Sequence, residues 1–216
     1  VNLNNYHTLL LNADYMPLSR RPLSTLSMQE TIKGVFLERF IVVEEYDRII
    51  HSAGRTFEMR VPSVVALKSY QSQNHIAPFT RMGILLREKG KCAYCHTPLK
   101  RKDLTFDHIY PRSKGGDTSW QNVVASCQSC NSKKANKLLA DSGLKVHVKP
   151  AEPTKMQLNS LAADFPPPIE HIHETWLSYL GMEKDMPTQK SGQTGAGIVL
   201  PNGMTSEQYW DAELDL

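Results

Sequence analysis

The first third of the chain alternates short apolar runs with turn-forming residues. One apolar run ends at Leu11 and is followed by Asn12-Ala13-Asp14, the pattern of a strand and a turn. Ser27 and Glu30 have the spacing of a capping box, and apolar residues then recur at helical intervals. Apolar and β-branched residues at 40–43, 48–51, 57–61 and 63–67 predict strands, the last two separated by Pro62. We expect a small N-terminal α+β unit over residues 6–70.

The middle of the chain predicts a different order of elements. A short helix is expected over 80–88, ended by Gly90. Leu104, Thr105 and Phe106 alternate as in a strand, residues 111–116 contain the breakers of a loop, and a second strand is expected at 123–125. A helix is expected to begin at Cys127 and to run through Leu138. This segment therefore predicts strand, loop, strand and helix.

Proline marks the last part of the chain. The triplet at 166–168 favours a stiff extended segment, a helix is expected over 169–180, and one or two helical turns over 207–214. We expect three parts: an N-terminal unit over 1–78, a central domain over 79–149 and an acidic, Pro-rich extension over 150–216.

Composition excludes several classes of protein. The chain is 40% hydrophobic and 22% charged over 216 residues, which is ordinary for a globular protein and too apolar for general disorder. It has no apolar run of about 18 residues that would cross a membrane, and no secretory signal is visible at its start. We expect a cytoplasmic protein that binds no membrane.

The net charge of +3 conceals an uneven distribution. Residues 81–149 carry 14 basic and 5 acidic side chains, whereas residues 150–216 carry 3 basic and 10 acidic ones. A basic block of this kind indicates a surface for a polyanion, although a solvated basic face is an equal alternative from charge alone.

The four cysteines form two Cys-x-x-Cys pairs. Cys92 and Cys95 make the first pair, and Cys127 and Cys130 the second. In a reducing compartment such pairs indicate a metal site rather than disulfides, and four thiolates are the ligands of a closed structural zinc site. Because four protein ligands leave no open position, we expect this zinc to be structural. Four unrelated thiols and a redox dithiol are the weaker alternatives.

Several motifs between and around these pairs share one resemblance. Asp107-His108, the Pro-Arg-Ser-Lys-Gly-Gly loop, Asn122 and the Cys-x-x-Cys-Asn-x-x-Lys segment together resemble the HNH endonuclease family, over about residues 87–140. The stretch from about Thr8 to Tyr70 resembles the N-terminal portion of bacterial and phage HNH proteins. The resemblance implies an α+β chain: an N-terminal unit, a zinc-stabilised ββα-metal core and a partly irregular C-terminal segment.

The resemblance implies a metal-dependent endonuclease that nicks or cuts double-stranded DNA. His108 would act as general base, because its pKa lies near neutral pH, and Asn122 would brace the loop that carries it. Asp107 and Asn131 would hold one Mg²⁺ or Mn²⁺ through oxygen atoms. Since neighbours on a strand point to opposite faces, Asp107 and His108 must lie at a strand end or irregular turn to share one site.

Five basic residues near these motifs are candidates for contacts to the DNA backbone. They are Arg112, Lys114, Lys133, Lys134 and Lys137, the last three expected on one side of the predicted helix. The N-terminal unit is the candidate for recognition of a DNA target or a partner.

Two other functions are compatible with the sequence. One is a zinc-stabilised DNA-binding protein without catalytic activity. The other is an assembly factor, for instance in phage packaging, whose acidic C-terminal segment docks a protein partner. That segment could instead fold over the basic site and restrain it. The resemblance implies a bacterial or phage-infected cell, in which restriction, phage DNA packaging, mobile-element nicking and antiphage defence are all open as biological settings.

Overall fold

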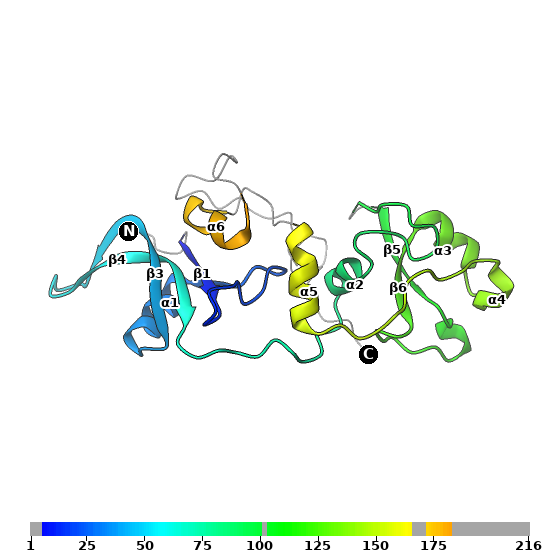
Figure 1. Ribbon diagram of the computed structural model, residues 1–216, viewed down its shortest axis with the longest axis horizontal. Helices are drawn as coiled ribbons and strands as arrows, with labels where there is room; N and C mark the ends of the chain where they lie inside the picture. Colours follow the sequence, from blue (N-terminus) through cyan, green and yellow to red (C-terminus); the bar gives the residue numbers. More distant parts are fainter. Residues whose placement is uncertain (1–5, 101–102, 166–171, 183–216) are drawn as a thin grey trace. The chain divides into compact units, whose positions relative to one another are not determined.

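The computed structural model describes residues 6–100, 103–165 and 172–182, which divide into two compact units (Figure 1). Of the described residues, unit 1 contains 6–72, 162–165 and 172–182, and unit 2 contains 73–100 and 103–161. The acidic extension expected over 150–216 is therefore divided between both units. Among the helices of the described ranges, none combines the length and apolar character needed to cross a lipid bilayer.

Unit 1 is built on a four-stranded sheet. Its strands are β1 (His7–Leu11), β2 (Thr25–Ser27), β3 (Phe40–His51) and β4 (Glu58–Leu67), in the order β2-β1-β4-β3. Strands β1 and β4 are parallel, and the other pairs are antiparallel. Helix α1 (Met28–Phe36) begins at the predicted capping box: the Ser27 side chain accepts from the Glu30 amide, and the Glu30 carboxylate accepts from the Ser27 amide.

Strand β4 continues through Pro62, where the sequence predicted a break. Proline has no N–H to donate to a neighbouring strand, so it is tolerated in a sheet mainly at edges and bulges. Here β3 supplies the irregularity: its register against β4 shifts three times between Val42 and Ile49, and Glu45 pairs with Pro62. The prediction of a break was wrong, because whether a proline interrupts a strand depends on the geometry of the partner strand.

The core of unit 1 joins residues from distant parts of the sequence. Leu9 and Leu11 of β1 and Val64 of β4 pack against the C-terminal segment η6 (Glu174–Trp176) and α6 (Leu177–Leu180). The Trp176 indole N–H donates to the Ser63 carbonyl. A further turn, η4 (Ala162–Asp164), belongs to the same unit. The helix expected over 169–180 begins at Glu174 within the described residues; the extended triplet at 166–168 and the turns at 207–214 lie outside them.

Unit 2 follows the predicted order. Helix α2 (Arg81–Arg87) precedes β5 (Leu104–His108), the turn η3 (Arg112–Lys114), β6 (Val123–Cys127) and α3 (Gln128–Lys134); α4 (Leu139–Ser142) and α5 (Lys155–Leu161) come last. Strands β5 and β6 form an antiparallel hairpin that runs from the Leu104–Cys127 pair to the His108–Val123 pair. The mixed α+β class expected from the sequence is confirmed.

Helix α3 is shorter than predicted. It ends at Lys134, because Ala135 has φ 45°, outside the helical region. The expected continuation through Leu138 was wrong, and with it the expected grouping of Lys133, Lys134 and Lys137 on one side of a helix.

Arg87, the last residue of α2, forms a buried ion pair with Glu88 and also hydrogen-bonds to the backbone at the start of β6. The Arg87 guanidinium donates to the Glu88 carboxylate and to the Trp120 and Val123 carbonyls. The other Glu88 oxygen, Oε2, is buried and has no hydrogen-bond partner among the described residues. Burial, opposed in part by Arg87, raises the Glu88 pKa to about 7.

Replacing Glu88 should change how stability depends on pH. Because the folded-state pKa is about 7 and the ordinary value 4.5, the Glu88 contribution is present below pH 4.5 and lost as pH rises through about 7. Between pH 6 and pH 8 the wild type should lose about 1 kcal/mol of unfolding free energy relative to Glu88→Gln, measured by urea denaturation. A difference that stays constant over this range would contradict the prediction.

Candidate active site and metal centre

Four thiols converge at the base of the β5–β6 hairpin. Cys92 and Cys95 lie in the loop after α2, Cys127 ends β6, and Cys130 lies in α3. Their four sulfur atoms all lie within 4.8 Å of one another, and Cys95 Sγ is 3.8 Å from Cys127 Sγ. A tetrahedral zinc site with Zn–S bonds of about 2.3 Å separates its sulfurs by about 3.8 Å. The cluster therefore fits the structural zinc site that the sequence predicted.

The environment of these thiols differs from one to another. Burial raises the pKa of Cys92 and of Cys130, which disfavours their thiolates. The Thr97 hydroxyl lies 3.2 Å from Cys95 Sγ and lowers the pKa of that exposed thiol to about 6. A bound cation would offset the burial penalty at the other positions, since a coordinating thiol is deprotonated.

Removing one thiol should release the metal and loosen unit 2. Cys130→Ser is expected to lower zinc from about one ion per chain to well below that, since a structural site needs all four ligands. The measurements are elemental analysis of the purified chain and its thermal unfolding. Ser132→Ala, an exposed position on the same helix, is the control. Full zinc occupancy and unchanged unfolding in Cys130→Ser would disprove the four-thiolate site.

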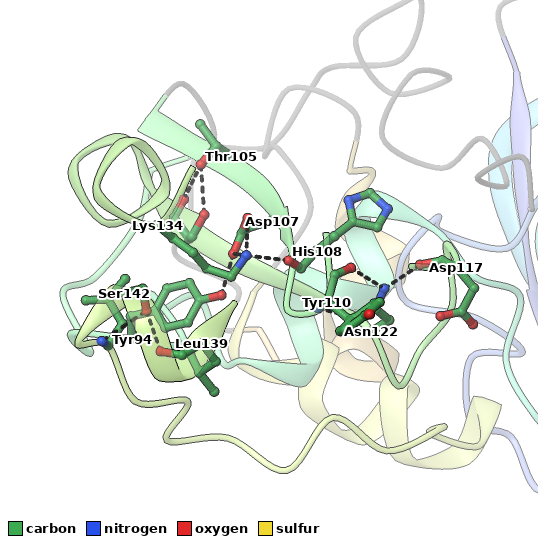
Figure 2. Close-up of polar contacts among 12 residues, drawn as sticks. Tyr94, Thr105, Asp107, His108, Tyr110, Asp117, Asn122, Lys134, Leu139 and Ser142 are labelled. Carbon is green, nitrogen blue, oxygen red and sulfur yellow. Dashed lines mark hydrogen bonds and ion pairs between the residues drawn. The ribbon is translucent and has the colours of Figure 1, made fainter. Parts of the chain in front are cut away.

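The carboxylate of Asp107 is enclosed by two side chains that the sequence did not assign to it (Figure 2). The Tyr94 hydroxyl donates to Asp107 Oδ2, and Lys134 Nζ lies 3.3 Å from Oδ1 and 3.2 Å from Oδ2. Lys134 is completely buried, and Asp107 is only 6% exposed. The same ammonium donates to the His108 carbonyl at 2.6 Å. Asp107 is thus one member of a buried, charge-balanced cluster.

The imidazole of His108 lies on the other face of β5. Regular pairing with β6 extends through both Asp107 and His108, so their side chains point to opposite sides of the strand, as Figure 2 shows. His108 Nε2 lies 3.0 Å from the Thr118 hydroxyl. Burial, and secondarily the charge of Arg112, lowers the His108 pKa, which favours the neutral ring at neutral pH. The expectation that the two side chains share one pocket is not met by this arrangement.

Asn122 organises the loop that follows His108. Its Oδ1 accepts from the Tyr110 amide at 2.7 Å, and its Nδ2 donates to the Tyr110 carbonyl at 3.0 Å and to the Asp117 carbonyl at 2.6 Å. Gly116 lies beneath this network: a Cβ there would come within 1.9 Å of the Tyr110 carbonyl oxygen. Asn122 thus closes the loop of residues 109–121 by hydrogen bonds, and Gly116 permits the close backbone approach that this closure requires.

Truncating Asn122 should open this loop. Asn122→Ala removes three hydrogen bonds at a buried position, and we expect a loss of about 2–3 kcal/mol of unfolding free energy. Urea denaturation measures this loss. The neighbouring Gln121 is exposed, so Gln121→Ala should change stability by less than about 0.5 kcal/mol. Equal effects of the two substitutions would show that the network does not stabilise the loop.

The predicted DNA-contact residues fall into two groups. Arg112 and Lys114 are exposed on η3, within the loop that Asn122 closes, and Lys133 and Lys137 are exposed at and beyond the end of α3. Lys134 is different, because its ammonium is buried against Asp107 and the His108 carbonyl. It is not presented to a polyanion in this structure, and the earlier grouping with the surface lysines was wrong.

Asp107 and Asn131, the predicted ligands of Mg²⁺ or Mn²⁺, carry suitable oxygen donors, but the Asp107 carboxylate is already paired. A carboxylate and an amide oxygen are donors that these ions prefer. Asn131 precedes Lys134 by one turn of α3, and residues three apart lie on one side of a helix. However, both Asp107 oxygens already accept from Tyr94 or face Lys134. As the side chains lie, this carboxylate is not open to a hydrated ion.

Sequence reasoning missed two residues of the site. Tyr94 lies between the zinc-ligand candidates Cys92 and Cys95, and its hydroxyl reaches Asp107. Thr118 lies in the glycine-containing loop and contacts the His108 ring. The two flanking cysteines mark the segment that contains Tyr94, but nothing in a single sequence singles out Thr118.

Comparison with known proteins gives three matches. Residues 92–146 match the family model of HNH endonucleases, and residues 8–75 match that of the N-terminal domain associated with HNH endonucleases. A stretch of 51 residues, 23% of the chain, is 41% identical to the CRISPR-associated endonuclease Cas9 of Corynebacterium diphtheriae. That stretch spans only 5% of the Cas9 protein.

Proposed function

We propose that this chain, whose residues 92–146 belong to the HNH endonuclease family, hydrolyses phosphodiester bonds in double-stranded DNA with His108 as general base. The observation that carries the proposal is the position of His108: it ends β5, its ring is held at one nitrogen by Thr118, and the loop beside it is closed by Asn122. A ring fixed at one nitrogen keeps the other available for proton transfer.

The proton path follows from this geometry. With Nε2 protonated and donating to the Thr118 hydroxyl, Nδ1 carries the free lone pair and accepts a proton from the attacking water. The lowered pKa of His108 keeps the ring neutral and able to accept at neutral pH. Asn122 acts on the loop and not on the reacting atoms, so we assign it a positioning role.

The basic loop and helix end supply the proposed DNA contacts. Arg112 and Lys114 share the loop with the groups that position His108, and Lys133 and Lys137 are exposed on the same unit. Contacts from such side chains to phosphates give affinity without sequence information. For unit 1, recognition of a DNA target or a partner protein stays a prediction from sequence.

A divalent ion, Mg²⁺ or Mn²⁺, is the proposed catalytic cofactor. Asp107 and Asn131 would supply its oxygen ligands, which requires that Asp107 be released from its present pairing with Lys134. When bound, such an ion stabilises negative charge on the phosphate and the leaving oxygen. The structural zinc would be separate from this ion.

The buried pair of Asp107 and Lys134 favours a second candidate, a zinc-stabilised DNA-binding protein without catalysis. In that protein Asp107 would serve only to balance Lys134 inside the fold. The two candidates differ in whether the purified chain breaks DNA, and not in whether it binds DNA.

A plasmid assay separates them. Zinc-loaded wild type should convert supercoiled plasmid to nicked or linear forms with Mg²⁺ and not without it. His108→Ala should lower this rate by about 10²–10⁴-fold, because a general base contributes that much, while DNA binding and zinc content stay unchanged.

His51→Ala is the matched control, since His51 is exposed in unit 1 and faces Glu58. Wild-type activity in His108→Ala would remove the assigned role. A wild type that binds DNA but never cuts it, over a panel of divalent metals, would establish the second candidate.

A further inference from the structure

Lys134 and Asp107 form a buried ion pair, although the sequence predicted Lys134 as a surface lysine and Asp107 as a metal ligand. Their side chains are 0% and 6% exposed, and the ammonium lies within 3.3 Å of both carboxylate oxygens. A lysine ammonium has three N–H donors. The two oxygens of Asp107 and the His108 carbonyl supply one acceptor for each of them. Lys134 is therefore satisfied where it lies, and its charge balances that of Asp107.

This arrangement and a divalent ion exclude each other. The Tyr94 hydroxyl donates to Oδ2, and the ammonium lies within 3.3 Å of both carboxylate oxygens. Two cations a few ångströms apart repel strongly in a buried site, where the effective dielectric constant is far below that of water. A metal ion at Asp107 and the Lys134 ammonium in its present position cannot coexist.

We propose that Lys134 is the resident cation of Asp107 and that a divalent ion reaches this carboxylate only by exchange with the lysine ammonium. The inference rests on the proposed function, because it assumes that Asp107 is a metal ligand there. Exchange would also free the His108 carbonyl, which Lys134 holds at 2.6 Å. Metal binding would thus be coupled to the backbone of the residue proposed as general base.

The inference makes Lys134 a determinant of metal affinity. Replacing it by a neutral side chain of similar length removes the competitor and leaves Asp107 as an unbalanced buried carboxylate that a metal ion can neutralise. Such a change should strengthen metal binding and weaken the metal-free fold, since breaking a buried pair by removing one partner is strongly destabilising.

The test is Mn²⁺ binding to the zinc-loaded full chain, measured by calorimetry and by the electron paramagnetic resonance signal of free Mn²⁺. Mn²⁺ is suitable because it competes poorly with zinc for thiolates. Lys134→Met should bind Mn²⁺ at least about tenfold more tightly than wild type, and Mn²⁺ should raise its melting temperature more. Lys134→Gln, which keeps a donor without the charge, is the second variant should Lys134→Met fail to fold.

Lys133→Met is the matched control, because it removes one charge from the same helix at an exposed position. It should leave Mn²⁺ affinity as in wild type. Adding Asp107→Asn to Lys134→Met should abolish the gain.

Other outcomes overturn the inference in distinguishable ways. If wild type and Lys134→Met bind Mn²⁺ equally and Asp107→Asn abolishes binding in both, Asp107 is a ligand without a competitor; the proposed function then stands. Weaker binding by Lys134→Met would mean that the lysine organises the site. Affinity that Asp107→Asn leaves unchanged would place the ion elsewhere and overturn the ligand assignment of the proposed function as well.

Discussion

Four sulfur atoms within 4.8 Å of one another form the constraint from which the rest of unit 2 is organised. Thiolates at this separation repel each other unless a cation joins them, so a bound ion would stabilise the cluster in its ionised form. The first cysteine pair follows α2, and the second joins β6 to α3. One ion bound by all four would hold the loop after α2, the end of β6 and the start of α3 together.

Two side chains connect the cysteine cluster to the buried carboxylate of Asp107. Tyr94 lies between the cysteines of the first pair, and Lys134 follows Cys130 by one helical turn. Both side chains end on Asp107. The buried carboxylate is therefore held by residues that flank the cysteine cluster in sequence on two sides, and the backbone carbonyl of His108 is held with it through Lys134. The candidate zinc site and the proposed catalytic residue are thus connected through Lys134 and Asp107.

Much of this architecture could be predicted from sequence, because the signals are local. The capping box of Ser27 and Glu30 fixes the start of α1, alternation identifies β5, and the paired cysteines identify a metal cluster. The Asn122 network is also local in effect, since it spans a loop of fixed length. These features depend on residues a few positions apart or on motifs whose chemistry is specific.

What could not be predicted depends on distant partners. Pro62 does not break β4, because β3 bulges opposite it. Lys134 has the character of a surface lysine, yet the end of α3 places it beside Asp107. The C-terminal Trp176 packs on β1 and β4, more than a hundred residues earlier in the chain. In each case the decisive neighbour is brought near only by the fold.

The irregular strand β3 has one more effect, which concerns other copies of the chain. β3 is at the edge of its sheet, where unpaired N–H and C=O groups are a template for intermolecular pairing. Three register shifts and the charged residues Glu44, Glu45 and Asp47 interrupt that template. The same bulges that admit a proline into the neighbouring strand thus protect the sheet from growing by aggregation.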